Sequence, residues 1–383
     1  MSVEQTLAEL VAFDSVSLRS NAPIISYLRQ RCESLGLQVH EYPQVDANGE
    51  TKINLVAQTV SDQSDEQTKS AAAPTFELAL VGHTDTVPYD TSWREALNLT
   101  EEDGKLFGRG ACDTKAYIAA SLTAIEKIDL GKLKRPLVLV FTCDEEIGCL
   151  GAKRLAAAKP FSARYAIVGE PTSLRPMRGG KGYCLAEITV RGREAHSAYP
   201  HLGSSAITHA AHLIEAIEGI AEAIRSEQHD AFDPPYTTLN VGLINGGTAK
   251  NVIPGECRFT LEWRTVPGQR TDHVLDLVKR VVNEMSESGY DFSCDIEAGR
   301  FDESFETVAD SELVQFLEQE SAKPSGTVAF GTEAPSMIAL GAEAVVFGPG
   351  DIRVAHRTGE FVPIAELNQS VEILRRAIQR FCL

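Results

Sequence analysis

The stretch FELALVGHTDT, residues 76–86, contains the pattern on which the interpretation of the fold rests. Six mainly apolar residues lead into glycine, histidine and aspartate, which is typical of a buried strand that opens into a polar loop. Three further apolar runs, at 137–141, 166–168 and 344–347, are followed in the same way by polar residues, glycine or proline. The four runs therefore predict buried strands whose loops carry polar side chains.

Helical patterns alternate with these strands at 24–35, 115–128 and 151–158. Strands that alternate with helices are typical of an α/β sheet that is covered by helices on both faces. We therefore expect a mixed-sheet α/β domain built from the two ends of the chain.

The middle of the chain has a different order of elements. Periodic segments predict a strand, a helix, two strands, a helix and a strand, at 184–191, 204–224, 239–243, 258–264, 272–287 and 290–296. This order is typical of a ferredoxin-like α+β domain. We expect an inserted domain over residues 180–300, entered through a glycine-rich hinge at 179–182, between segments 1–179 and 301–383 of the first domain. A polar stretch at 61–70 is expected to form a solvated loop.

Length and composition limit the class of protein. The 383 residues exceed the size of about 250–300 at which single cores stop growing, so two domains are expected. The net charge of −18 disfavours nucleic acid as a partner, and no apolar run of about 18 residues predicts a membrane span. The eight cysteines form no C-x-x-C pair, and the N-terminus lacks the features of a signal peptide, so reduced thiols in the cytoplasm are expected.

Five side chains suited to metal binding follow the predicted strands or open the next helix. They are His83, Asp113, Glu146, Glu170 and His356. In open α/β sheets ligands bind beyond the carboxyl ends of the strands, so these side chains are expected to converge. Imidazole and carboxylate are suitable ligands for zinc, and also for cobalt or manganese.

Two histidines and three carboxylates are more ligands than one catalytic zinc ion needs. A carboxylate that bridges two ions about 3.5–4 Å apart would use all five. Taken singly, His83 suits a core histidine, Glu145-Glu146 a helix start, and Glu170 a plain turn. Together they favour a metal site, because burying an unpaired acid after an apolar strand is costly.

Three motifs resemble those of a zinc metallohydrolase family that includes aminoacylases, carboxypeptidases and succinyl-diaminopimelate desuccinylases. They are GHTDTVP at 82–88, DEE at 144–146 and GEPT at 169–172, in the order and spacing of that family. The likeness covers nearly the whole chain. It implies hydrolysis of a linear amide by an enzyme with two divalent metal ions, with zinc preferred and cobalt or manganese as alternatives.

The resemblance also implies roles for individual residues. The implied ligands are His83 with Glu170 at one ion, Glu146 with His356 at the other, and Asp113 as the bridge. Glu145 is implied as the general base, and Asp85 as the residue that orients the first histidine.

Two motifs depart from the family pattern. Thr114 and Ala116 stand where the family usually has methionine and glycine after the bridging aspartate. Further on, Gly359 precedes Glu360 where an Asp-Glu pair is expected. Neither departure removes a ligand, but both bear on the shape of the pocket.

Two segments, GEPTSLRP at 169–176 and GTEAP at 331–335, are most similar to the branch of the family that deacetylates N-acetylornithine. This likeness implies a small N-acyl amino acid as substrate and a place in arginine biosynthesis. Asn251 and Arg264 are expected to contact the substrate, whose carboxylate a guanidinium binds well. Glu333 is expected to meet a cationic side chain or to shape the metal pocket.

His196 resembles the family's inserted-domain histidine, which stabilises the oxyanion in the site of the partner subunit. It therefore implies a homodimer and an inserted domain that serves as lid and dimerisation domain. N-succinyl-diaminopimelate, N-acetylcitrulline and a dipeptide stay open as alternative substrates, and a non-catalytic homologue is the alternative class. The chain contains neither the G-x-S-x-G elbow of serine hydrolases nor a phosphate-binding G-x-x-x-x-G-K-[ST] loop.

Overall fold

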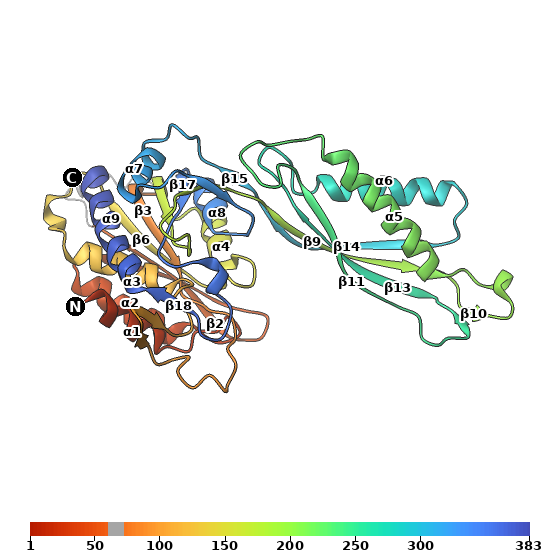
Figure 1. Cartoon of the computed structure of the whole chain (residues 1–383), viewed down its shortest axis with the longest axis horizontal. Coiled ribbons are helices and arrows are strands. Elements are labelled where there is room, and N and C mark those ends of the chain that lie inside the picture. Colours follow the sequence, from red (N-terminus) through yellow and green to blue (C-terminus); the bar gives the residue numbers. More distant parts are fainter. Residues whose placement is uncertain (60–72) are drawn as a thin grey trace. The chain divides into compact units, whose positions relative to one another are not determined.

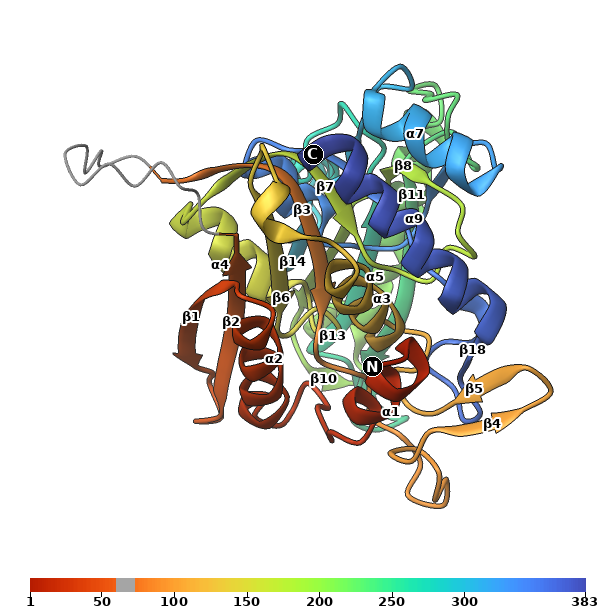
Figure 2. The ribbon, with the colours of Figure 1, turned by 90° about the vertical axis from the view of Figure 1, so that its left-hand side faces the viewer.

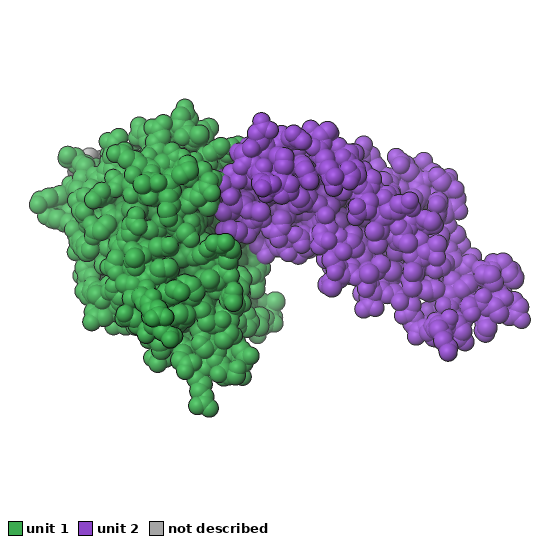
Figure 3. Space-filling model, viewed as in Figure 1, with its two compact units in different colours: residues 1–178, 306–326, 332–383 green, residues 179–305, 327–331 purple. Residues whose placement is uncertain are grey.

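The computed structural model describes residues 1–59 and 73–383, so the stretch expected to form a loop at 61–70 lies outside the described residues. The chain forms two compact units (Figure 3). Unit 1 consists of Met1–Arg178, Glu306–Gly326 and Thr332–Leu383, and unit 2 of Gly179–Phe305 and Thr327–Gly331. The sequence predicts limits of 180 and 300 for the inserted domain.

The larger sheet is mixed and has nine strands in the order β1-β2-β6-β3-β7-β17-β8-β15, with β16 paired to β8 (Figure 1). Its strands are β1 Gln38–Val45, β2 Thr51–Gln58, β3 Thr75–His83, β6 Leu137–Thr142, β7 Ser162–Val168, β8 Met177–Gly180, β15 Phe305–Glu306, β16 Gly326–Val328 and β17 Glu343–Val346. The central strands β6, β3, β7 and β17 run parallel, whereas β1 and β2 are antiparallel to their neighbours.

The register of the parallel strands brings their carboxyl ends to one edge of the sheet. His83 at the end of β3 lies opposite Thr142 at the end of β6, and Val81 of β3 lies opposite Val168 at the end of β7. Val168 in turn lies opposite Val346 at the end of β17. The loops after all four strands therefore start from the same edge, as the sequence predicts.

Helices cover both faces of this sheet. One face carries α1 Val3–Val11, α2 Ala22–Ser34, α3 Lys115–Glu126, α7 Glu312–Ser321 and α9 Ile364–Cys382, whose apolar residues share a core with alternate strand residues such as Leu78 and Leu80. Helices α1, α3 and α9 pack on one another (Figure 2). On the other face, α4 Leu150–Ala158 and α8 Ala334–Ala339 pack together against β2, β7 and β17.

A small antiparallel sheet in unit 1 has the order β18-β5-β4. Its strands are β4 Thr100–Glu102, β5 Lys105–Phe107 and β18 Phe361–Pro363. Phe107 lies opposite Phe361, so residues that follow β5 and residues that precede β18 leave the sheet side by side. Two short helical turns, η1 Leu130–Lys132 and η3 Ile352–Val354, also belong to unit 1, and a third, η2 Pro200–Leu202, belongs to unit 2.

Unit 2 contains a four-stranded antiparallel sheet in the order β11-β13-β9-β14. Along the chain its elements are β9 Tyr183–Arg191, α5 Ala206–Ile224, β11 Thr238–Gly246, β13 Glu256–Arg264, α6 His273–Glu287 and β14 Ser293–Asp302. The first and third strands of the motif lie in the centre, which is the ferredoxin-like arrangement. A two-stranded ribbon joins β10 Ala195–His196 to β12 Val252–Ile253.

The core of unit 2 lies between this sheet and its two helices. Alternate residues of β9, such as Ile188 and Val190, pack with Leu213 of α5 and Val278 of α6. The predicted fold class, a mixed-sheet α/β domain with helices on both faces and an inserted ferredoxin-like domain, is confirmed. Among the described helices, none combines the length and the apolar character needed to span a bilayer.

Candidate metal centre

The five predicted ligand residues of unit 1 lie at loops that leave the two sheets. His83 ends β3, Glu146 and Glu170 follow β6 and β7, Asp113 lies between β5 and α3, and His356 lies between η3 and β18. These positions span more than 270 residues of sequence, from His83 to His356. The fold brings the five side chains into two groups.

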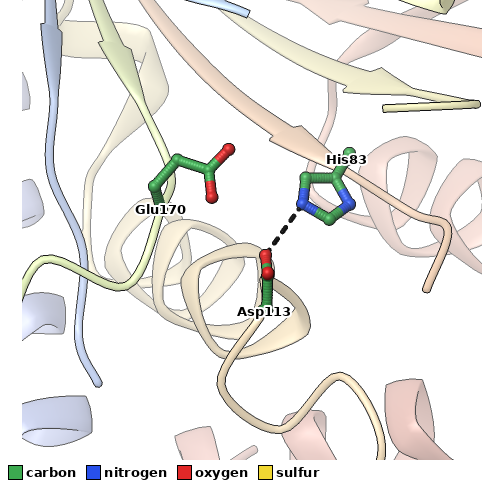
Figure 4. A group of neighbouring side chains, drawn as sticks. All are labelled: His83, Asp113 and Glu170. Atoms are coloured by element: carbon green, nitrogen blue, oxygen red, sulfur yellow. Dashed lines mark hydrogen bonds and ion pairs between the residues drawn. The ribbon is translucent and has the colours of Figure 1, made fainter. Parts of the chain in front are cut away.

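In the first group, His83, Asp113 and Glu170 each offer one ligand atom, and these atoms lie within 4.8 Å of one another. His83 Nε2 lies 3.0 Å from Asp113 Oδ1. Figure 4 shows Glu170, from the end of β7, pointing toward the gap between the other two side chains. All three side chains are buried, so solvent does not screen their charges.

In the second group, Asp113, Glu146 and His356 meet the same distance limit. His356 Nε2 lies 3.0 Å from Asp113 Oδ2 and 3.0 Å from Glu146 Oε2. Asp113 therefore belongs to both groups and turns one carboxylate oxygen toward each histidine. This is the arrangement that a carboxylate bridging two ions requires.

The carboxylates of the site repel one another. Burial is the main reason that the pKa of Glu145 rises to about 8, and the charge of Glu146 adds to this although His83 opposes it. Burial, followed by the charges of Asp113 and Glu145, raises the pKa of Glu170 well above its ordinary value. Acids that are buried this close together need positive charge beside them.

Protons on the two histidines supply that charge when no ion is bound. Hydrogen bonds to Asp113 and Glu146 raise the pKa of His356 to about 10. Burial lowers the pKa of His83, but Asp113, Glu145 and Asp85 together raise it well above its ordinary value. A divalent cation and these protons compete for the same nitrogen atoms.

The donor set fits divalent cations. It consists of imidazole nitrogens and carboxylate oxygens, the ligands that zinc, cobalt and manganese accept. The Oε1 atom of Glu146 is buried and has no hydrogen-bond partner among the described residues. A bound cation would satisfy this atom and would relieve the repulsion between the carboxylates.

Asp85 contacts two parts of the centre, one through its backbone and one through its carboxylate. His83 Nδ1 lies 3.0 Å from the backbone oxygen of Asp85, whereas the nearest carboxylate oxygen of Asp85 is 3.7 Å away. The carboxylate instead accepts hydrogen bonds from Ser17 Oγ at 2.6 Å and from the backbone nitrogens of Glu145 and Glu146 at 3.1 and 3.3 Å. Asp85 therefore fixes the histidine through its main chain and the Glu145–Glu146 loop through its side chain.

Glu145 belongs to neither ligand group, although it lies beside both. Its side chain is 9% exposed, and its Oε1 atom accepts a hydrogen bond from Cys149 Sγ at 3.2 Å. The backbone nitrogens of Gly148 and Cys149 both donate to the carbonyl oxygen of Glu145, which forms a tight turn before α4. This turn holds a second carboxylate next to the ligand Glu146.

Several buried residues that support the site escaped the sequence-based prediction. Lys52 forms an ion pair with Asp144 at 3.1 Å, just before the Glu145–Glu146 loop. Arg109 pairs with Glu360 beneath the loop that carries Asp113. Of these residues, only Glu360 was marked in the sequence, by the departure at 359–360, and only its contacts show what it does.

The other predicted site residues are members of neither ligand group. Glu333 lies in unit 1 just before α8, and burial raises its pKa to about 7 although His83 opposes the shift. His196 and Asn251 belong to unit 2, where Ser197 N donates to the Asn251 carbonyl oxygen at 3.0 Å. Both side chains are exposed.

Arg264 ends β13 in unit 2. Its guanidinium lies 4.4 Å from the centre of the Tyr183 ring, donates to Glu262 at 2.8 Å and donates to the Ala329 carbonyl oxygen at 2.7 Å. The side chain is therefore held in place by three neighbours while part of it stays exposed.

Known proteins resemble this chain over its full length. Residues 79–380 match the peptidase family M20/M25/M40. The chain is 49% identical over 382 residues to the acetylornithine deacetylase of Myxococcus xanthus, covering 100% of this chain and 98% of that protein. It is 32% identical over 376 residues to the acetylornithine deacetylase of Proteus mirabilis, covering 97% and 93%. A tripeptidase structure from Staphylococcus aureus has a TM-score of 0.78 at 24% identity, covering 98% of both chains.

Proposed function

Because the chain belongs to the peptidase family M20/M25/M40, we propose that this metal-dependent amide hydrolase converts N-acetylornithine into ornithine and acetate in arginine biosynthesis. The observation that carries the proposal is the pair of ligand groups that share Asp113 beside the buried Glu145. The 49% identity to the acetylornithine deacetylase of Myxococcus xanthus supports the choice of N-acetylornithine as the substrate. A cytoplasmic location suits such an enzyme.

The two ligand groups would hold two divalent ions. His83 and Glu170 would bind one ion, Glu146 and His356 the other, and Asp113 would bridge them. Zinc is the ion we propose, and cobalt and manganese suit the same donors. When bound, the ions would polarise the acyl carbonyl group and make a water molecule more acidic.

Glu145 would act as the general base and then as the general acid. Its carboxylate would accept the proton of the attacking water and pass that proton to the nitrogen of the leaving amine. The hydrogen bond from Cys149 and the bond from the Glu145 backbone nitrogen to Asp85 hold this residue in one orientation. A fixed orientation favours proton transfer in both directions.

Unit 2 would supply the contacts to the rest of the substrate. Arg264, which its neighbours hold in place, would bind the α-carboxylate with two hydrogen bonds, and Asn251 would assist it. We propose that unit 2 also serves as the lid and dimerisation domain of a homodimer. His196 would then stabilise the oxyanion in the site of a partner subunit.

Glu333 is the proposed contact for the ammonium group of ornithine. Its side chain is 1% exposed, and its Oε1 atom has no hydrogen-bond partner among the described residues. Burial raises the pKa of this carboxyl group, and a cationic group beside it favours the charged form, which a neutral group does not. Glu333 would therefore make the enzyme select N-acetylornithine over N-acetylcitrulline.

A substrate panel tests this function. Purified enzyme with measured zinc content is assayed on N-acetylornithine, N-acetylcitrulline, N-succinyl-diaminopimelate and a dipeptide, with wild type and Glu333→Gln. We expect N-acetylornithine to have the highest kcat/KM, and we expect Glu333→Gln to lower it about 10–100-fold with little change for N-acetylcitrulline. A higher kcat/KM for another substrate would contradict the proposed substrate, and full activity without metal would contradict the proposed mechanism.

A further inference from the structure

Glu360 is a buried carboxylate that lies beneath the loop carrying Asp113. Its Oε1 atom accepts hydrogen bonds from the backbone nitrogens of Cys112 at 2.9 Å and Asp113 at 3.0 Å. Its Oε2 atom accepts a hydrogen bond from Arg109 Nη1 at 2.5 Å. One side chain from the C-terminal part of the chain therefore binds three residues of the 109–113 loop.

The main chain joins the same two segments. Gly108 N donates to the Glu360 carbonyl oxygen at 3.1 Å, and Phe107 of β5 lies opposite Phe361 of β18. The segment that ends at Glu360 contains His356, and Glu360 N donates to the Arg357 carbonyl oxygen at 3.2 Å. The two loops that carry Asp113 and His356 are thus attached to each other directly next to these ligands.

Burying the carboxylate of Glu360 at this position costs free energy. A carboxylate buried beside another carboxylate, that of Asp113, raises the electrostatic energy of the fold. Arg109 offsets one negative charge, and its own side chain is buried and stacked 5.6 Å from the Trp93 ring centre. The buried Lys115 also interacts favourably with this charge, and the two backbone hydrogen bonds at Cys112 and Asp113 are what Glu360 adds to the loop itself.

We propose that Glu360 is a positioning residue that fixes the backbone at Cys112 and Asp113, so that the two oxygens of Asp113 face His83 and His356 separately. The proposal rests on the metal centre proposed above. Glu360 touches no metal ion and no substrate. Without its two hydrogen bonds the Asp113 backbone can rotate, and the shared carboxylate then no longer suits both ligand groups.

Metal affinity tests the proposal directly. Wild type and Glu360→Gln are stripped of metal, and zinc binding is measured by competition with a chromogenic chelator. The glutamine keeps the size of the side chain but removes the charge and places an NH₂ group near Arg109. We expect zinc affinity to fall about 10–100-fold, as it does when partners of ligand residues are lost, and kcat to fall more than KM rises.

Asp46→Asn is the matched control. Asp46 Oδ1 also accepts two backbone hydrogen bonds, from Asn48 at 2.8 Å and Glu50 at 2.9 Å, but in the exposed turn between β1 and β2. This variant is expected to keep the zinc affinity and kcat of wild type. A role for Glu360 in general stability alone would lower the melting temperature of the metal-free protein without a change in zinc affinity.

The outcomes separate the two proposals. Wild-type zinc affinity in folded Glu360→Gln would overturn the positioning role. If Glu360→Gln does not fold, Glu360→Asp replaces it, because this variant keeps the charge but shortens the side chain. Wild-type zinc affinity in Glu360→Asp would also overturn the positioning role. A wild-type protein that binds no zinc, cobalt or manganese would instead refute the metal centre itself.

Discussion

At the scale of single residues, Glu145 and Glu146 are neighbours in sequence with different surroundings. Glu146 Oε2 lies 3.0 Å from His356 and belongs to a ligand group, whereas Glu145 is held by Cys149 and lies outside both groups. Asp85 accepts the backbone hydrogen bonds of both residues, whereas their carboxylates contact different partners. One is thus suited to hold a metal ion and the other to move a proton.

The variant Glu145→Gln tests whether Glu145 transfers a proton without taking part in metal binding. Removing the base leaves both ligand groups intact, so we expect kcat to fall about 10²–10⁴-fold with unchanged metal content. Steady-state kinetics and metal analysis on the same samples measure both effects. Glu102→Gln, which changes an exposed carboxylate of β4, is the control and should have the kcat and the metal content of wild type. A Glu145→Gln enzyme with nearly normal kcat would assign the base to another residue.

At the scale of secondary structure, the site depends on how closely β7 approaches α3. A Cβ atom added at Gly169, the residue after β7, would lie 2.1 Å from the Tyr117 ring. That ring cannot move aside, because Tyr117 is 1% exposed and donates to the Ile167 carbonyl oxygen at 2.8 Å. The glycine therefore lets the next residue, Glu170, reach the first ligand group.

Gly169→Ala should consequently destabilise the protein. We expect a loss of about 1–3 kcal/mol in the free energy of unfolding, which is typical of overpacking, together with weaker metal binding at the group that contains Glu170. Denaturant unfolding and zinc titration measure the two effects. Gly219→Ala is the control, since nothing lies within 4 Å of its added Cβ in α5, and it should stabilise by about 0.5–1 kcal/mol. Equal stability of wild type and Gly169→Ala would show that Tyr117 can be displaced.

At the scale of the whole molecule, unit 1 contains both ligand groups and unit 2 contains His196, Asn251 and Arg264. The buried acids of unit 1 repel one another when no ion is bound, so the metal-free state is the less stable one. Metal binding and the stability of unit 1 are therefore linked.

Removal of metal should lower both activity and stability. At a free zinc concentration of 100 times the Kd, bound metal contributes about 2.7 kcal/mol per site to the free energy of unfolding. Thermal unfolding with and without a chelator measures this loss, and added zinc should restore both properties. The same chelator saturated with zinc beforehand is the control. An unchanged melting temperature after complete metal removal would show that the acids need no cation.

The sequence by itself determined the four central strands, three of the helices around them, the ferredoxin-like insertion and the candidate ligands. These depend on local periodicity and on polar residues directly after apolar runs, as at His83 and Glu170, which a single segment contains. Only the tertiary structure decided that Asp113 faces both histidines, that Asp85 holds His83 through its backbone, and that Glu360 lies beneath the Asp113 loop. The contacts of Glu360 join residues as far as 251 positions apart, and no local pattern records which distant donor meets which acceptor.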